Sequence, residues 1–273
     1  MPHRYRHPLL ALLLFYCTWL CISTAVAAPP ETLRVLCYNI HYGQGMDGKY
    51  DIPRLAEAIK QTQPDLVALQ EVDVGVRRSG QVHQARELGR LTGLAVYFGP
   101  TQHYEGGLFG NAVLTNLPCS EIHIQPLPYT ESTAELTTYP RAAIALQLTT
   151  PGGFAFRAIS THFQHNVPAD RVAEAQAMNE LFGRDALPTI LAGDLNATPE
   201  DEPLTILTEC WTNALDADIA PSAPSPNPRV RIDYILHRGT GLKVRSSEVI
   251  NEPLASDHRP VLVVFEVQGP MAE

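Results

Sequence analysis

Polar side chains that can do chemistry recur in or beside short apolar runs of this sequence. Asn39 ends the first run, Glu71 follows the second, and Asp194 and Asn196 follow a later one. A rigid strand that ends in such a residue presents it at a fixed position, which is where sites are commonly built. The full set is Asn39, Glu71, Asp194, Asn196, Asp233, Asp257 and His258.

These residue types suit the hydrolysis of a phosphoester. Carboxylates are ligands for a hard divalent cation, which neutralises charge on phosphoryl oxygens. A carboxylate or a histidine can deprotonate the attacking water, and amide and imidazole groups can hold the non-bridging oxygens. Any one of these residues could instead be a turn former or a helix cap. Because such residues occur in or beside five of the apolar runs, they indicate a site together.

Other chemistries lack their sequence requirements. Pairs of cysteine ligands are absent, which argues against a structural zinc site. Neither Gly-x-x-x-x-Gly-Lys-Ser/Thr nor Gly-x-Ser-x-Gly occurs in the sequence. A P-loop ATPase and a serine hydrolase are therefore disfavoured.

Apolar and alternating runs predict many short strands and few helices. The expected strands are Leu33 to Ile40, Leu66 to Gln70, Ala112 to Thr115, Ala142 to Leu148, Phe154 to Ser160, Thr189 to Ala192, Ile232 to Leu236 and Val261 to Val267. The expected helices are Ile52 to Gln63, Gln84 to Thr92 and Ala169 to Phe182. Several neighbouring strands have no helix between them, which favours two packed sheets with helices outside. The proline-rich segment Pro221 to Pro228 is expected to be a surface spacer.

The motifs, taken together, resemble those of the endonuclease/exonuclease/phosphatase superfamily, which includes deoxyribonuclease I. They occur in that family's order over nearly the whole chain after the leader. They are Tyr38-Asn39-Ile40, Leu69-Gln70-Glu71-Val72-Asp73, Thr161-His162-Phe163, Gly193-Asp194-Leu195-Asn196, Arg231-Ile232-Asp233-Tyr234-Ile235 and Ser256-Asp257-His258-Arg259-Pro260. The resemblance implies an α/β fold, a four-layer α/β sandwich with two central mixed β-sheets flanked by helices.

The resemblance also implies a metal site. Glu71 would ligate Mg²⁺ or Mn²⁺, with Asn39 beside it as a ligand or as a partner of the ligand. Asp257 would lie near the metal or its waters.

The catalytic roles implied by the resemblance fall on five residues. Asp194 would orient or deprotonate the attacking water, and Asn196 would bind a phosphoryl oxygen. His258 would contact the scissile phosphate, and Asp233 would fix its tautomer. His162 would assist phosphate binding or protonate the leaving group, whereas a strand-end histidine without a role is the alternative.

Four further residues are candidates for phosphate or substrate binding. Arginine matches phosphate oxygens because its donors form a fork. Arg141, Arg77 and Arg78 are therefore included, although a surface arginine is usually only solvated. Asn111 lies in a glycine-rich segment that resembles one in small family members.

The N-terminus has the three parts of a secretory signal peptide: a basic start, an apolar run and small residues. We expect residues 1–28 to be the signal and residues 29–273 to be the enzyme domain, in a secreted or periplasmic protein. An uncleaved membrane anchor is the alternative. The net charge is −9 and would become −11 once Arg4 and Arg6 are removed, which gives no general attraction to a polyanion. A disulfide between Cys119 and Cys210 is left open.

The expected function is a secreted Mg²⁺-dependent phosphoesterase that hydrolyses a phosphodiester or phosphomonoester by metal-assisted in-line attack of water. An extracytoplasmic endonuclease of the deoxyribonuclease I type is the alternative, and a non-catalytic binding module on the same fold is a third. The expected partner is a phosphoester substrate, either lipid-linked, small or nucleic acid. No obligate protein partner is expected, and the chain is expected to be a monomer.

Overall fold

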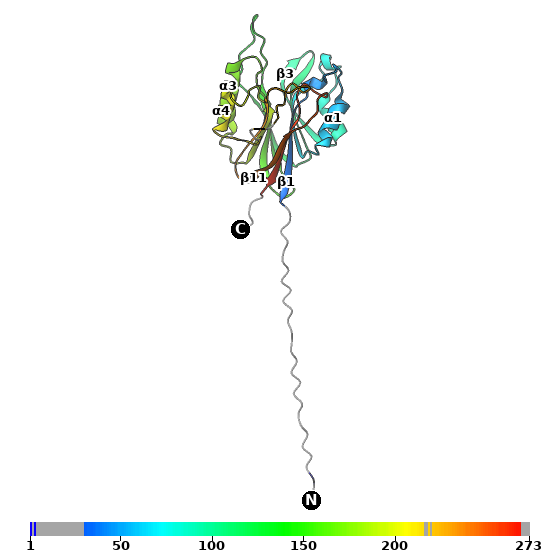
Figure 1. Ribbon diagram of the computed structural model, residues 1–273, viewed down its shortest axis with the longest axis vertical. Coiled ribbons are helices and arrows are strands. Elements are labelled where there is room, and N and C mark those ends of the chain that lie inside the picture. Colours follow the sequence, from blue (N-terminus) through cyan, green and yellow to red (C-terminus); the bar gives the residue numbers. More distant parts are fainter. Residues whose placement is uncertain (2, 4–29, 216–217, 219, 269–273) are drawn as a thin grey trace.

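The strands form two six-stranded sheets that pack face to face (Figure 1). The computed structural model describes Met1, His3 and residues 30–215, 218 and 220–268. The first sheet has the order β11 (Leu242–Val249), β12 (Val261–Val267), β1 (Glu31–Asn39), β2 (Leu66–Val74), β4 (Gly107–Thr115) and β3 (Ala95–Tyr104). The second has the order β5 (Cys119–Pro126), β6 (Ala142–Thr149), β7 (Ala155–His162), β8 (Thr189–Asp194), β10 (Asp233–Arg238) and β9 (Thr212–Asn213).

Each sheet has one parallel pair at its centre, and this pairing positions the site. β1 runs parallel to β2 with Asn39 opposite Gln70, and β7 runs parallel to β8 with His162 opposite Asp194. Parallel strands end at the same edge of a sheet, so these residues reach one end of the molecule together. β10 runs antiparallel to β8, and its first residue, Asp233, lies opposite Asp194.

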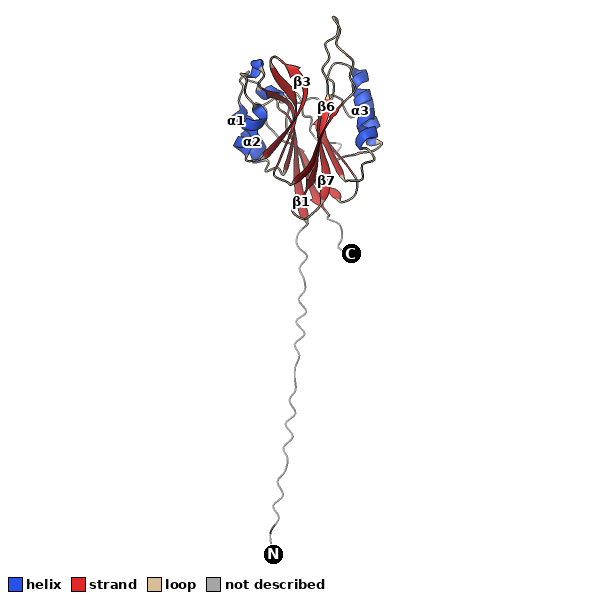
Figure 2. Cartoon of the chain, turned by 180° about the vertical axis from the view of Figure 1, so that it is seen from behind, coloured by secondary structure: helices blue, strands red, loops and turns tan. Residues whose placement is uncertain are grey.

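Helices cover the outer faces of both sheets (Figure 2). α1 (Ile52–Gln61) and α2 (Gln84–Thr92) lie against the first sheet, and α3 (Pro168–Phe182) and α4 (Glu202–Thr208) lie against the second. The Asp51 carboxylate accepts the Arg54 N–H at the start of α1, which satisfies one of the free amides there. The result is helix, sheet, sheet, helix, and the predicted four-layer sandwich is confirmed.

The alternation of β1 explains why it lies at the centre of the molecule. Val35 and Cys37 belong to the apolar cluster between the sheets, whereas Leu36 and Tyr38 belong to the cluster beneath α1 and α2. Both faces of the strand are therefore buried, as its run of apolar residues requires. A buried hydrogen bond also crosses between the sheets, from Gln70 Nε2 to Ser160 Oγ at 3.1 Å.

The eight expected strands and three expected helices are present, although β2 and β4 extend four and five residues beyond the expected ranges, and four strands and one α-helix were not expected. The additions are β3, β5, β9, β11 and α4. β5 is mostly exposed, and only Ile122 and Ile124 alternate with polar residues in it, which is too short an apolar pattern to mark a strand. Cys37, Cys119 and Cys210 are all free thiols, and the Cys119–Cys210 bridge is absent from the described structure. Within the described ranges no helix has the length and apolar character needed to cross a membrane.

The expected signal peptide lies almost wholly outside the described residues. Both the signal peptide and the boundary at residue 29 therefore stay predictions. The first described strand, β1, begins at Glu31.

Candidate active site

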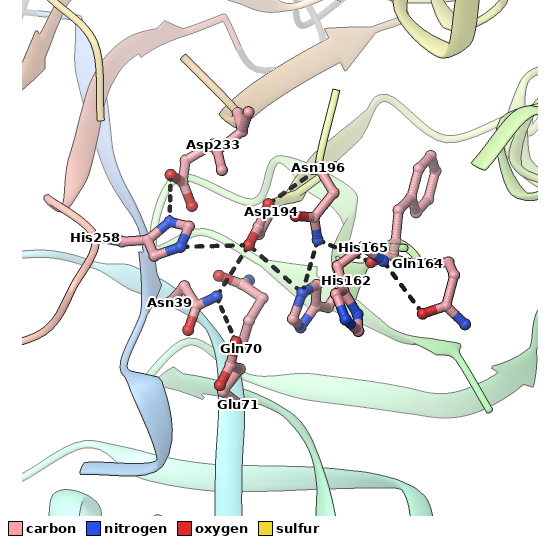
Figure 3. A network of polar contacts seen from close by, with 12 residues as sticks. Asn39, Gln70, Glu71, His162, Gln164, His165, Asp194, Asn196, Asp233 and His258 are labelled. Carbon is pink, nitrogen blue, oxygen red and sulfur yellow. Dashed lines mark hydrogen bonds and ion pairs between the residues drawn. The ribbon is translucent and has the colours of Figure 1, made fainter. Parts of the chain in front are cut away.

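Asn39 joins the carboxylates of the two sheets (Figure 3). Its Nδ2 donates to Glu71 Oε1 at 3.1 Å and to Asp194 Oδ2 at 3.0 Å. Its Oδ1 accepts the backbone N–H of His41 at 3.0 Å, and since that group can only donate, the amide orientation is fixed. Asn39 therefore acts as a buried donor that holds Glu71 beside Asp194.

Glu71 reaches the site through a local distortion of β2. The pairing of β2 with β4 shifts register between Leu69 and Val72, and Glu71 has φ 58°. A β-bulge of this kind turns a side chain in a new direction and is common beside active sites. His41, Tyr42 and Asn196 also have positive φ and also lie at the site. Such strained non-glycine residues persist where function requires their placement.

His258 lies between two buried aspartates. Its Nδ1 hydrogen-bonds to Asp233 Oδ2 at 2.8 Å, and its Nε2 lies 3.7 Å from Asp194 Oδ2. The side chain of Ser256 holds the turn before it, because Ser256 Oγ donates to the Asn39 carbonyl at 2.7 Å and accepts the His258 N–H at 3.3 Å. The turn after β11 is thereby fixed to the end of β1.

Burial and charge shift the pKa values of this group in a consistent direction. Burial alone would lower the pKa of His258, but the carboxylates of Asp233 and Asp194 more than offset it, and the pKa rises well above its usual value. Burial raises the pKa of Asp194. An imidazolium held between two carboxylates can donate to a phosphoryl oxygen while Asp194 accepts a proton.

His162 is a neutral donor in this geometry. Asn196 Nδ2 donates to the Phe163 carbonyl at 3.0 Å and lies 3.0 Å from His162 Nε2, which must therefore be an acceptor. The proton of the ring then sits on Nδ1, which is buried and has no partner in the described chain. Burial, with Arg141 and His258 adding to it, lowers the pKa of His162 well below its usual value.

The proline-rich segment lies between β9 and β10 with Pro224, Pro226 and Asn227 exposed, as expected of a surface spacer, but it also supports the site. Ser222 and Ser225 within it are completely buried. Ser225 Oγ donates to the Ser256 carbonyl, and its N–H donates to the Asp257 carbonyl at 2.7 Å. The Arg259 N–H donates to the Ser222 carbonyl at 2.8 Å. The serines between the prolines therefore bind the turn that carries His258, a role that the sequence did not predict.

A cavity of about 300 Å³ opens over these groups. Eight predicted site residues line it: Glu71, Arg78, Arg141, His162, Asp194, Asn196, Asp257 and His258. Asn39 and Asp233 lie behind this layer, where they hold Glu71 and His258. Seven further residues also line the cavity: His41, Tyr42, Gln102, Tyr104, Phe109, Tyr139 and His165. Tyr104 and Phe109 belong to the glycine-rich segment that contains Asn111, and His41 and His165 follow two of the motifs, but no pattern marked these side chains as lining a site.

Two predicted binding residues lie outside this lining. Arg77 is exposed, in the short 3₁₀ turn Arg77–Ser79. Asn111 is buried, and its Nδ2 donates to the Ala142 carbonyl at 2.9 Å, so it links β4 to β6 across the sheets.

The two arginines of the cavity differ in how their charge is balanced. Arg78 makes two hydrogen bonds of 2.9 Å to the buried carboxylate of Asp73. Arg141 is only 5% exposed, and among the described residues its guanidinium makes no hydrogen bond or ion pair. Burial lowers the pKa of Arg141. A buried arginine without a partner at a cavity wall is suited to bind an incoming anion.

The oxygen-rich side of the cavity fits a hard divalent cation. Glu71, Asp194 and Asp257 contribute carboxylates to one wall, and in the described chain nothing donates to Glu71 Oε2. Asp194, Asp233 and His258 also bring ligand atoms within 4.8 Å of one another, a spacing that could hold a metal. In that group His258 Nδ1 and Asp233 Oδ2 are already joined by a hydrogen bond of 2.8 Å. The open carboxylate of Glu71 is therefore the better position for a cation.

The sequence model of the endonuclease/exonuclease/phosphatase family matches residues 36–258, a range that contains the whole site. The chain belongs to this family. Its members are metal-dependent phosphoesterases and nucleases, so the chain is a hydrolase of this class. No curated protein sequence matches the chain.

Solved structures of the family share the fold. An endonuclease/exonuclease/phosphatase from Beutenbergia cavernae is 21% identical over 88% of this chain and 73% of its own, with a TM-score of 0.69. A mannosyl-6-phosphatase from Bacteroides thetaiotaomicron is 20% identical over 85% and 98%, with a TM-score of 0.69. The human Nocturnin catalytic domain, with a bound sulfate anion, is 23% identical over 87% and 95%, with a TM-score of 0.64. These likenesses concern the fold.

Proposed function

We propose that this family member is a secreted or periplasmic, Mg²⁺- or Mn²⁺-dependent phosphoesterase that acts on a small phosphomonoester or phosphodiester. The observation that carries the proposal is the buried Arg141, which makes no ion pair in the described chain and lines a cavity of about 300 Å³ together with Glu71 and Asp194. An anion that enters meets a guanidinium without an ion-pair partner and the carboxylates of a cation site. Cavities of this size are at the small end of ligand sites, which span roughly 300–1,000 Å³.

Glu71 and the site around it would hold the divalent cation. When bound, the cation offsets negative charge on the phosphoryl oxygens. Asn39 keeps the Glu71 carboxylate in place through its 3.1 Å hydrogen bond, and Asp257 faces the same cavity. The carboxylates otherwise repel one another and the substrate, so a cation on this wall is electrostatically favourable.

The side chains opposite Glu71 would carry out the proton transfers. Asp194 accepts a proton from the attacking water, and its raised pKa makes it a stronger base than an exposed aspartate. His258, charged beside Asp233, donates to a non-bridging oxygen. His162 lines the same cavity, and its 3.0 Å contact with Asn196 Nδ2 would orient that amide beside the phosphate.

A substrate panel tests this proposal. Purified protein is incubated with chromogenic phosphomonoesters and phosphodiesters, a sugar phosphate, sphingomyelin, phosphoinositides, RNA and plasmid DNA, each with Mg²⁺ and with chelator. We expect turnover of small esters with Mg²⁺ and none with chelator. Preferential cleavage of plasmid DNA would instead support the deoxyribonuclease-type alternative. Binding of these compounds without turnover would support a non-catalytic module.

A further inference from the structure

One wall of the cavity is aromatic and carries no net charge. The guanidinium carbon of Arg78 lies 3.8 Å from the centre of the Tyr42 ring, 4.6 Å from that of Tyr104 and 5.2 Å from that of Phe109. All four side chains line the cavity. The two hydrogen bonds from Arg78 to Asp73, which is completely buried, balance the charge of the guanidinium.

This wall is built before any ligand arrives. Gln84 is 1% exposed, and its Nε2 donates to the Tyr42 carbonyl at 2.6 Å while its Oε1 accepts the Asp73 N–H at 3.0 Å. One buried amide thus fixes both Tyr42, whose φ of 42° is strained, and the partner of Arg78. Such a device rigidifies a recognition surface, since half-satisfied buried polar groups would be costly.

A second pair of rings also lines the cavity. The Tyr139 ring lies 5.6 Å from the ring of His165. Against these aromatic side chains a ring could pack its C–H faces while its substituents meet the hydroxyls of the tyrosines and the amide of Gln102.

Charge decides which ring fits. Of the two arginines among the described lining residues, Arg141 is unpaired and lies with the catalytic carboxylates and histidines, whereas Arg78 is neutralised. A second phosphate on the leaving group would meet the Arg78–Asp73 pair, where the Asp73 charge cancels the attraction. The cavity therefore offers one uncompensated anion site, not two.

We propose that Tyr42, Arg78, Tyr104 and Phe109 form a leaving-group subsite for an uncharged, hydroxyl-bearing ring, and that Asp73 sets this specificity. The substrate then carries its only anionic group at the catalytic residues. This inference rests on the proposed function and names its substrate class: a monophosphate ester of a sugar or a cyclitol.

Calorimetric binding tests the inference independently of turnover. The background is Asp194→Asn with Mg²⁺, which keeps Glu71 but removes the proposed base. The probes are glucose 6-phosphate, glucose 1,6-bisphosphate, myo-inositol 1-phosphate, methyl phosphate and a duplex oligonucleotide. We expect the ring monophosphates to bind more tightly than methyl phosphate and at least as tightly as the bisphosphate. Whichever of glucose 6-phosphate and myo-inositol 1-phosphate binds more tightly identifies the ring as a sugar or a cyclitol.

Adding Asp73→Asn leaves the Arg78 charge uncompensated and should shift the preference toward the bisphosphate by about tenfold or more, as a charge-assisted hydrogen bond would. Asp185→Asn is the matched control, because it removes the partner of Arg157 far from the cavity lining and should not shift the preference. If Asp73→Asn does not fold, Tyr104→Ala tests the subsite instead. Compared with the background protein, this variant should bind ring monophosphates several-fold more weakly and methyl phosphate equally well.

Several results would overturn the subsite. They are tighter binding of the bisphosphate or the oligonucleotide by the background protein, no binding of ring esters, or an unchanged preference in both variants. The proposed function fails separately, if the unmodified protein binds the ring esters with this preference but hydrolyses none of the small esters with Mg²⁺.

Discussion

Replacing His258 and Asp233 singly and together tests whether they act as a unit. Their atoms Nδ1 and Oδ2 are 2.8 Å apart, and Asp233 is 1% exposed. His258→Ala removes a positioned donor and should lower kcat by about 10² or more. Asp233→Asn replaces a charge-assisted hydrogen bond with a neutral one, a loss of about 1–1.5 kcal/mol or roughly tenfold. Independent groups would give about 10³ in the double variant, whereas a unit gives the loss of His258→Ala alone.

The assay is kcat under saturating substrate and Mg²⁺ for the four proteins, with pH profiles. Because Asp233 raises the pKa of His258, the basic limb of the Asp233→Asn profile should move to lower pH. Unfolding gives a second check. His258→Ala leaves the buried Asp233 carboxylate unpaired, a cost of about 3–5 kcal/mol, and adding Asp233→Asn should recover part of it. Multiplicative losses in kcat with an unmoved pH limb would refute the coupling.

Two further predictions concern stability. Burial raises the pKa of Glu174 to about 8 from its usual 4.5, so the folded state binds more protons between these pH values and its free energy of unfolding falls as pH rises through that window. For the unmodified protein we expect the free energy of unfolding to fall by roughly 3–5 kcal/mol between pH 5 and pH 8, and Glu174→Gln should remove this fall. Denaturant titrations at the two pH values measure it, and the same pH dependence in Glu174→Gln would contradict the prediction. Ser160→Ala removes two hydrogen bonds that join β7 to β2 across the sheets. In one, Gln70 Nε2 donates to Ser160 Oγ, and in the other Ser160 Oγ donates to the Leu69 carbonyl. The substitution should lower the free energy of unfolding by about 1–3 kcal/mol with little change in kcat, and an equal loss of kcat would tie these hydrogen bonds to catalysis instead.

The sequence was sufficient for the centre of the fold and for eight of the residues that line the cavity. Central strands such as β1 are buried on both faces, so nearly all of their residues must be apolar and the strands are visible in the sequence as apolar runs. Asn39, His162 and Asp194 end their strands, whereas Glu71 projects from a bulge within β2. The pairing of β1 with β2 and of β7 with β8 gathers these side chains. The strand β5 was not predicted because most side chains of an exposed edge strand are not required to be apolar.

The cavity walls could not be predicted because they depend on contacts between distant segments. Tyr42, Tyr104 and Phe109 meet around Arg78 only after β2, β3 and β4 pair. Likewise, the sequence offers both Arg78 and Arg141 as candidates for phosphate binding. Only the geometry shows that Asp73 neutralises the first and that the second has no partner in the described chain.

The most direct test of the proposed metal-dependent hydrolysis is the Mg²⁺ dependence of turnover in the unmodified protein and in Glu71→Gln. Initial rates on a chromogenic phosphoester are measured after exhaustive chelation and during readdition of Mg²⁺ or Mn²⁺. Glu71 holds the open carboxylate of the oxygen-rich wall, so we predict no activity with chelator and full recovery with metal. In Glu71→Gln the half-saturating Mg²⁺ concentration should rise and kcat should fall by about 10². Full activity in chelator, or an unchanged Mg²⁺ dependence in Glu71→Gln, would contradict the account.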